Sequence, residues 1–173
     1  MDLDQLKKIM PYAGQRAGIF FAPLVAAMAE FGIDTPIRQA AFLGQIAHES
    51  GSLKYVRELA SGDAYEGRAD LGNTKPGDGP RFKGRGLIQI TGRTNYQACS
   101  LALFGDDRLV QTPALLEEPE AACRSAGWFW QAHRLNSLAD IGGLRAITRA
   151  INGGYNGYED RLAYYERAQA VLS

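Results

Sequence analysis

The sequence predicts a mainly α-helical fold with one small lobe built from loops and short strands. Apolar residues recur at helical spacing before residue 51 and again after residue 92, whereas strand-like alternation is confined to Leu87–Thr91. The stretch between the helical regions is rich in glycine and contains Pro76 and Pro80, which restricts it to short elements. Because substrate grooves are commonly built from irregular loops on a rigid scaffold, we expect a cleft between the lobe and the helices.

Three helices are expected in the first fifty residues. The first covers 2–10 and ends at Pro11, and the second covers 15–31 and ends at Gly32. The third begins at Pro36, after a capping residue, and carries an apolar stripe that ends at Glu49. Glu49 is therefore expected on the last turn of a helix that faces the lobe.

Helical patterns return in the second half of the chain. They cover the ranges 95–104, 118–133, 142–152 and 158–172. Neither an internal repeat nor a composition break divides the sequence, so residues 1–173 are expected to form a single domain.

Composition excludes several classes of function. Lys plus Arg and Asp plus Glu both number 19, so no net field concentrates a polyanion, and nucleic acid is a poor candidate partner. The most apolar stretch, residues 18–28, is too short to span a bilayer and contains Pro23. The first residues lack the basic head and cleavage site of a secretory signal, which predicts synthesis in the cytoplasm.

Metal and redox chemistry are not expected. Cys99 and Cys123 are the only cysteines and His48 and His133 the only histidines, so neither a CxxC motif nor a histidine cluster is present. Two buried thiols are favoured over a disulfide between the cysteines.

The string AHESGSLKYVRE, residues 47–58, holds the first candidate for catalysis. A carboxyl group at the end of an apolar helix becomes partly desolvated, which raises its pKa and suits Glu49 to protonate a glycosidic oxygen. The plainer interpretation of such a glutamate is a solvated surface residue or a member of an ion pair.

Hydrolysis of a glycosidic bond generally needs a second carboxylate. Glu58 follows a glycine turn and can return across a groove toward Glu49, and Asp63, Glu66 and Asp70 lie further along. Each of these acids can equally be a solvated loop charge, and Asp63 is placed to form a turn.

A second motif, FKGRGLIQITGRTNY, covers residues 82–96. Gly84 and Gly86 allow backbone to approach a ligand closely, and Gln89 and Thr91 would lie on one face of a short strand. These groups can hydrogen-bond a sugar or hold the attacking water. A phosphate loop is excluded, since no GKS or GKT follows a long apolar strand.

A third motif, INGG, closes a helix at Asn152. A helix C-cap explains it, and the Asn152 amide can alternatively point into the groove.

Together AHESG, FKGRGLIQITGRTNY and INGG, followed by the run 161–165, resemble the family 19 chitinases and related phage or prophage endolysins. The resemblance covers roughly residue 37 to the C-terminus. It implies a lysozyme-like α+β fold with a helical body, a small β-rich lobe and a groove between them.

The resemblance also implies roles for individual residues. Glu49 would be the general acid, Glu58 the base that activates water, and Thr91 a residue that positions the water. Arg161 would belong to an ion-pair network around Glu58, and its charge would lower the pKa of that base. Sugar would be bound by His48, Gln89, Asn95, Tyr96 and Asn152.

One position departs from the pattern of the family. Thr94 stands where chitinases of this family commonly have a tyrosine that contacts sugar. The mechanism implied is one-step attack by water with inversion, with carboxyl groups about 6.5 to 9.5 Å apart and no metal or organic cofactor.

The lobe sequence from Tyr55 to Gly86 is more similar to the endolysin branch than to the plant branch. This favours peptidoglycan as substrate over chitin, with a holin releasing the enzyme from the host cytoplasm to the cell wall, and a monomer as the working form. Rival hypotheses are a chitinase, a noncatalytic wall-binding protein and a structural phage component. A zinc or Cys-His amidase is the weakest alternative.

Overall fold

The computed structural model describes residues 1–173 and contains ten α-helices and three short 3-10 helices. The elements in chain order are α1 (Leu3–Ile9), α2 (Arg16–Glu30), α3 (Pro36–Glu49), η1 (Asp63–Tyr65), η2 (Ala69–Leu71), α4 (Asp78–Arg81), α5 (Arg93–Phe104), α6 (Arg108–Gln111), η3 (Pro113–Glu117), α7 (Pro119–Ala132), α8 (Leu135–Asp140), α9 (Leu144–Asn152) and α10 (Tyr158–Leu172). The expected helical body is confirmed, and most helix ends lie within two residues of the expected positions.

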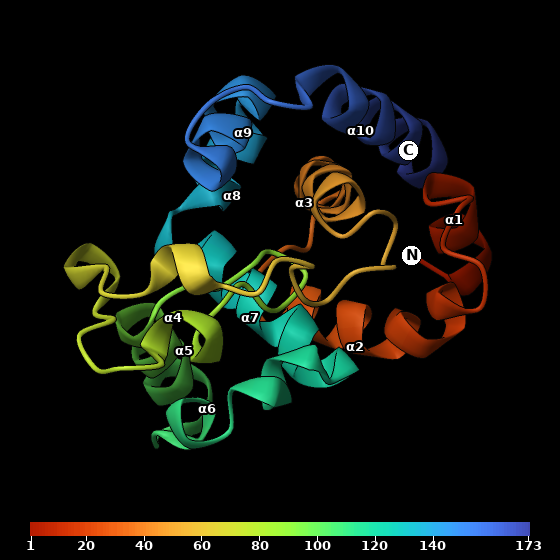
Figure 1. Cartoon of the computed structure of the whole chain (residues 1–173). Helices are drawn as coiled ribbons and strands as arrows, with labels where there is room; N and C mark the ends of the chain where they lie inside the picture. The colour runs from red at the N-terminus through yellow and green to blue at the C-terminus, as the bar shows by residue number, and fades with distance from the viewer.

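Helix α3 lies in the middle of the body, with α10, α1, α2, α7 and α8 around it (Figure 1). Every residue from Ala40 to Ala47 is buried, as expected of a helix that is covered on all sides. Gly44 allows α10 to approach closely, because a Cβ atom there would lie 3.2 Å from the carbonyl oxygen of Arg161. The N-terminal turns of α10 are therefore held against the C-terminal half of α3.

Aromatic packing joins α3 to α7. Phe42 and Trp130 are fully buried and meet edge to face, with ring centroids 5.2 Å apart. Cys99 and Cys123 are both buried, free thiols, and burial raises the pKa of Cys99 to about 12. No helix is long and apolar enough to cross a membrane.

The lobe covers the chain between α3 and α5 and contains no continuous strand. Its β structure is limited to two antiparallel bridges, Arg57 with Arg85 and Arg85 with Ile90. The prediction of a strand over Leu87–Thr91 was wrong, because residues 86–89 form a tight turn closed by hydrogen bonds between Arg85 and Ile90. The apolar residues of this turn are buried, and Gly86 lies so close to α7 that a Cβ atom would be 2.7 Å from the Ser125 hydroxyl.

Candidate active site

The chain reverses sharply at the end of α3. Gly51, Ser52 and Leu53 all have positive φ, at 56°, 59° and 68°, and the left-handed conformation costs a non-glycine residue roughly 1–2 kcal/mol. Two hydrogen bonds stabilise the turn: Leu53 N–H donates to the Ser50 hydroxyl at 2.8 Å, and the Ser52 and Tyr164 hydroxyls lie 2.9 Å apart. Such strain is typical of functional sites.

Glu49 lies at the end of α3 and is held by Arg161 of α10. The Arg161 guanidinium donates to Glu49 at 2.5 Å and to the Gln45 side-chain oxygen at 2.6 Å. A further bond, from Nε to the Asn156 carbonyl, measures 3.3 Å. Arg161 is 1% exposed, whereas the Glu49 side chain is 21% exposed and so remains accessible to a ligand.

Arg161 was expected in an ion-pair network around Glu58, and the ion pair that it forms in the structure is with Glu49. The reason is the packing of α10 along α3, which brings the first turn of α10 against Gly44 and Gln45. Arg161 therefore orients the predicted acid, and its expected effect on the base stays a prediction.

Glu58 is fixed by the backbone of Gly84. The Glu58 N–H donates to the Gly84 carbonyl at 3.0 Å, and the Gly84 N–H donates to the Glu58 carboxylate at 2.8 Å. A Cβ atom on Gly84 would lie 2.5 Å from the Gln89 side-chain oxygen and 2.8 Å from the Glu58 carboxylate. The bare backbone of Gly84 thus allows Glu58 and Gln89 to lie side by side.

Tyr65 lies near this carboxylate, although the sequence did not single it out. Burial, followed by the neighbouring charge of Glu58, raises the pKa of Tyr65, which keeps the phenol protonated beside the carboxylate. Only the folded loop shows this proximity, because η1 places Tyr65 seven residues downstream of Glu58.

Replacing Gly84 by alanine tests the close approach. The added methyl group should displace Glu58 and Gln89, lowering kcat at least ~10-fold and stability by about 1–3 kcal/mol. Steady-state kinetics and thermal unfolding would measure both effects. Gly18→Ala is the matched control, because nothing lies within 4 Å of its Cβ position and its activity should be unchanged. Normal activity in Gly84→Ala would contradict the role of this glycine.

The other candidate carboxylates have structural partners. Glu66 accepts the N–H groups of Gly77 and Gly79, each at 2.7 Å, which shapes the lobe. Asp70 is paired with Arg68, and Asp63 accepts from the Ser61 hydroxyl at 2.7 Å, as expected of a turn residue. Of the four acids considered after Glu49, Glu58 is the one that lies beside Gln89.

Gln89 and Asn95, both expected to bind sugar, line one pocket of about 150 Å³. The rest of its wall consists of Ile90, Trp128, Phe129 and His133. Phe129 and His133 are stacked, with ring centroids 4.0 Å apart. Aromatic faces combined with a few amides suit a sugar ring, which has both apolar faces and hydroxyl groups. Sequence reasoning missed these aromatic residues because WFW in a helix also matches a buried core.

Tyr96 and Thr91 were also predicted to act in the site, and the structure buries Tyr96 but leaves Thr91 partly exposed. Tyr96 is fully buried, and its hydroxyl donates to the Lys83 carbonyl at 2.6 Å and accepts from Arg85 at 3.0 Å. The prediction that Tyr96 binds sugar was wrong, because its hydroxyl supports the backbone beside Gly84. Thr91 is partly exposed and its hydroxyl makes no hydrogen bond within the protein, so its role with water stays a prediction.

His48 and Asn152 lie at the ends of α3 and α9. The Nδ1 atom of His48 is 2.7 Å from the carboxylate of Asp160, and its ring covers Gly157, where a Cβ atom would come within 2.1 Å. Asn152 is exposed, and Gly153 caps α9 by donating to the Arg149 carbonyl at 2.9 Å. The Asn152 amide has no partner within the protein, and sugar binding by both residues stays a prediction.

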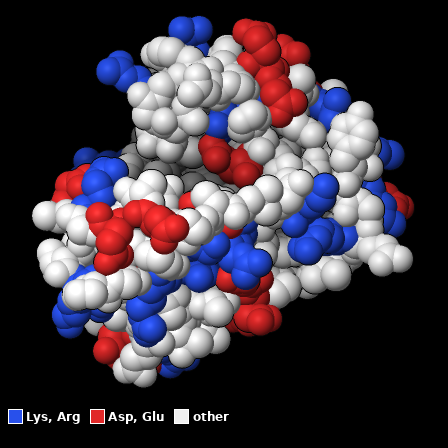
Figure 2. All heavy atoms as spheres, viewed as in Figure 1, with Lys and Arg blue, Asp and Glu red and all other residues white.

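Figure 2 shows the molecule hollowed between the lobe and the helices α8 to α10, with acidic side chains in the hollow.

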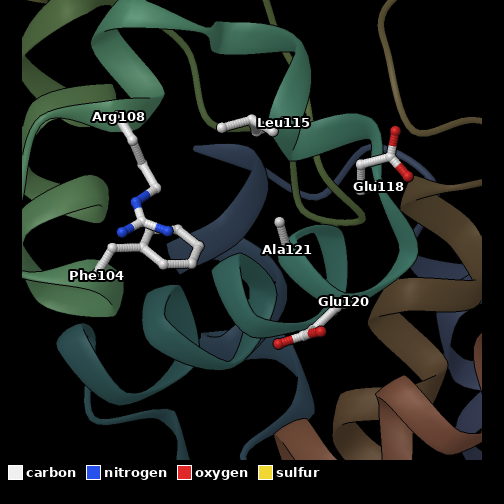
Figure 3. A pocket seen from close by; sticks show the side chains of 6 residues that line it. All are labelled: Phe104, Arg108, Leu115, Glu118, Glu120 and Ala121. Carbon is white, nitrogen blue, oxygen red and sulfur yellow. The ribbon is translucent and has the colours of Figure 1, made fainter.

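A separate pocket of about 280 Å³ lies on α5, α6 and α7, lined by Phe104, Arg108, Leu115, Glu118, Glu120 and Ala121 (Figure 3). Its acids lie at the N-terminus of α7, where they stabilise the helix dipole. None of the predicted site residues lines this pocket.

The structure therefore holds an acid paired with an arginine at the end of α3, a second carboxylate on the lobe beside Gly84, and an amide- and aromatic-lined pocket. Such a set can transfer a proton to a glycosidic oxygen and activate water. No group of His, Cys, Asp or Glu side chains is arranged to hold a metal ion.

Comparison with solved structures establishes the fold. The chain superposes on chitinase C from Streptomyces griseus with a TM-score of 0.79 at 23% identity, covering 99% of this chain and 76% of that one. A bacterial family 19 chitinase gives the same TM-score at 24% identity, with coverage of 99% and 94%. No protein-family model matches the sequence.

Comparison with other protein sequences establishes the family. A glycosyl hydrolase family 19 domain-containing protein from Haemophilus influenzae is 31% identical over 91% of this chain and 90% of its own length. An endochitinase from Arabidopsis thaliana is 38% identical over 66% of this chain, which spans only 39% of that enzyme. The chain therefore belongs to glycosyl hydrolase family 19 and is a glycosidase.

Proposed function

We propose that this enzyme hydrolyses the β-1,4-linked glycan of bacterial peptidoglycan. Glu49 gives its proton to the glycosidic oxygen, and Glu58 activates water on the other side of the sugar. Inversion at the anomeric carbon follows from this one-step attack. The bond from the Gly84 N–H to the Glu58 carboxylate, with the side chains of Gln89 and Tyr65 nearby, supports its role as the base.

Residue 94 is the observation that carries the choice of peptidoglycan. Thr94 packs on Gly72, where a Cβ atom would lie 2.0 Å from the threonine hydroxyl, and it projects no ring toward the sugar. The family resemblance predicts a tyrosine there in enzymes that act on chitin.

The proposal extends to the biological setting. A phage or prophage endolysin with these residues would reach the wall after a holin opens the membrane, and would work as a monomer. Host lysis would follow from cutting the glycan strands.

Hydrolysis of chitin oligomers is the second candidate. It is favoured by the endochitinases among the relatives and by the pocket that Gln89 and Asn95 share with Trp128. Both polymers contain N-acetylglucosamine, so this pocket suits either.

The test is to incubate the purified protein separately with permeabilised Gram-negative cell walls and with chitin oligomers, and to identify the products by mass spectrometry. Muropeptides with new reducing sugars would support the proposal, and cleavage of chitin alone would overturn it in favour of the second candidate. Proton NMR of fresh products would show the inverted anomer if water attacks directly.

A further inference from the structure

The segment that carries Glu58 is bordered by basic side chains. Lys54 and Arg57 belong to it, Arg16 donates to the Leu53 carbonyl at 3.3 Å, and Lys83 donates to the Ala60 carbonyl at 2.8 Å. Arg85 is joined to Arg57 by a backbone bridge. In a chain with zero net charge, this is a local concentration of positive charge.

This charge is only partly neutralised. Glu117 accepts from Arg85 at 2.8 Å and lies 3.6 Å from Arg57, so one carboxylate serves two guanidinium groups. Lys54 lies over the Tyr55 ring, 5.0 Å from its centroid, and contacts no carboxylate. An anionic ligand could therefore bind here without displacing an internal ion pair of Lys54.

The same segment forms a pocket of about 170 Å³. Its lining consists of Lys54, Tyr55, Val56, Arg57, Leu59 and Glu117, which we call the basic pocket. Leu59 is 84% exposed and Tyr55 is 38% exposed, so apolar surface lies beside the cations. Glu58 stands between Arg57 and Leu59 in the sequence but does not line this pocket.

We propose, on the basis of the proposed function, that the basic pocket binds the acidic peptide stem carried by the muramyl residues of peptidoglycan. Arg57 and Leu59 are the chain neighbours of Glu58, so the basic pocket adjoins the backbone that carries this carboxylate. In this proposal, a branch of a glycan bound at Glu58 lies in the basic pocket. The cations meet the stem's carboxylates, and Tyr55 and Leu59 contact its small aliphatic side chains.

Charge complementarity favours this occupant over the alternatives. Chitin is uncharged and offers nothing to Lys54 or Arg57. A polyphosphate would need a longer basic surface than one pocket, since nucleic-acid affinity depends on neutralising many phosphates. A peptide with several carboxylates and aliphatic side chains matches both the charge and the apolar surface of the pocket.

The test uses the charge-reversed variant Lys54→Glu/Arg57→Glu on two substrates. One is intact cell wall, and the other is the same glycan after an amidase has removed the peptide stems. We expect kcat/KM on intact wall to fall ~10-fold, with a much smaller change on the stripped glycan, because rim charges act mainly on association. Added salt should reduce the advantage of the wild-type enzyme on intact wall.

Lys7→Glu/Lys8→Glu is the matched control. It makes the same change in net charge on exposed residues of α1, which lies at the edge of the body away from the hollow (Figures 1 and 2). This variant should keep wild-type rates on both substrates. Circular dichroism would verify that both variants are folded.

The outcomes separate the two proposals. Equal losses on intact and stripped glycan, or no loss on either, would overturn the stem-binding role while leaving the proposed function in place. A wild-type enzyme that cut chitin oligomers but neither form of peptidoglycan would overturn the proposed function and the stem-binding role together.

Discussion

Replacing Glu49 by glutamine is expected to lower the rate of glycan hydrolysis by about 10²- to 10⁴-fold, the usual contribution of a general acid. The amide has nearly the same volume but cannot donate a proton to the leaving oxygen in the same way. Because its oxygen can still accept from Arg161, whose donor atom lies 2.5 Å from the native carboxylate, the fold should persist. Release of reducing ends would measure the loss, and thermal unfolding would measure the stability.

Glu66→Gln is the control for this substitution. Glu66 is an exposed acid of the same lobe that bonds only backbone groups, so its replacement should affect stability more than catalysis. Wild-type hydrolysis by Glu49→Gln would exclude Glu49 as the proton donor.

Replacing Arg161 by methionine is expected to lower stability by about 3 kcal/mol, because the change leaves buried polar groups unpaired. The Gln45 oxygen is fully buried and loses its donor, while Glu49 loses the group that orients it. Part of the cost is relieved by water, since Glu49 is 21% exposed. For a domain of this size the loss corresponds to a fall of roughly 6–12 °C in Tm.

Arg161→Lys is the informative companion variant. Lysine keeps the positive charge but cannot reach Gln45, Glu49 and the Asn156 carbonyl together, because it lacks the planar fork of arginine. The stability of Arg161→Lys should lie between those of the wild-type protein and Arg161→Met. Its kcat should fall by a larger factor than its KM changes. A Tm for Arg161→Met equal to that of the wild-type protein would contradict this account.

Local signals in the sequence were sufficient to predict the seven longest helices and the helix ends that matter for the site, but not the short helices α4, α6 and α8. Pro36 after Thr35 marks the start of α3, and Gly51 follows its end, which places Glu49 on the last turn. Glycines within FKGRG indicated a close approach to the backbone, which at Gly84 is made by Glu58 and Gln89, whereas the approach of a ligand stays a prediction. These features depend on the conformational preferences of a few neighbouring residues, which the sequence contains in full.

Alternation in LIQIT was a weaker signal. A strand requires a partner that supplies hydrogen bonds along its length, and the chain provides only the bridge between Arg85 and Ile90. The apolar side chains of this stretch are buried in a turn pressed against α7 instead. Such a pattern indicates that the apolar side chains are buried, but it does not indicate whether the segment pairs with another strand.

By itself, the sequence determined the helical body, the loop-rich lobe and the positions of Glu49 and Glu58 on either side of a turn. Only the tertiary structure decided that Arg161 orients Glu49, that Tyr96 is buried, and that Trp128 and Phe129 join Gln89 in a pocket. Helix formation follows from local backbone preferences, whereas the partner of a side chain depends on how distant helices pack.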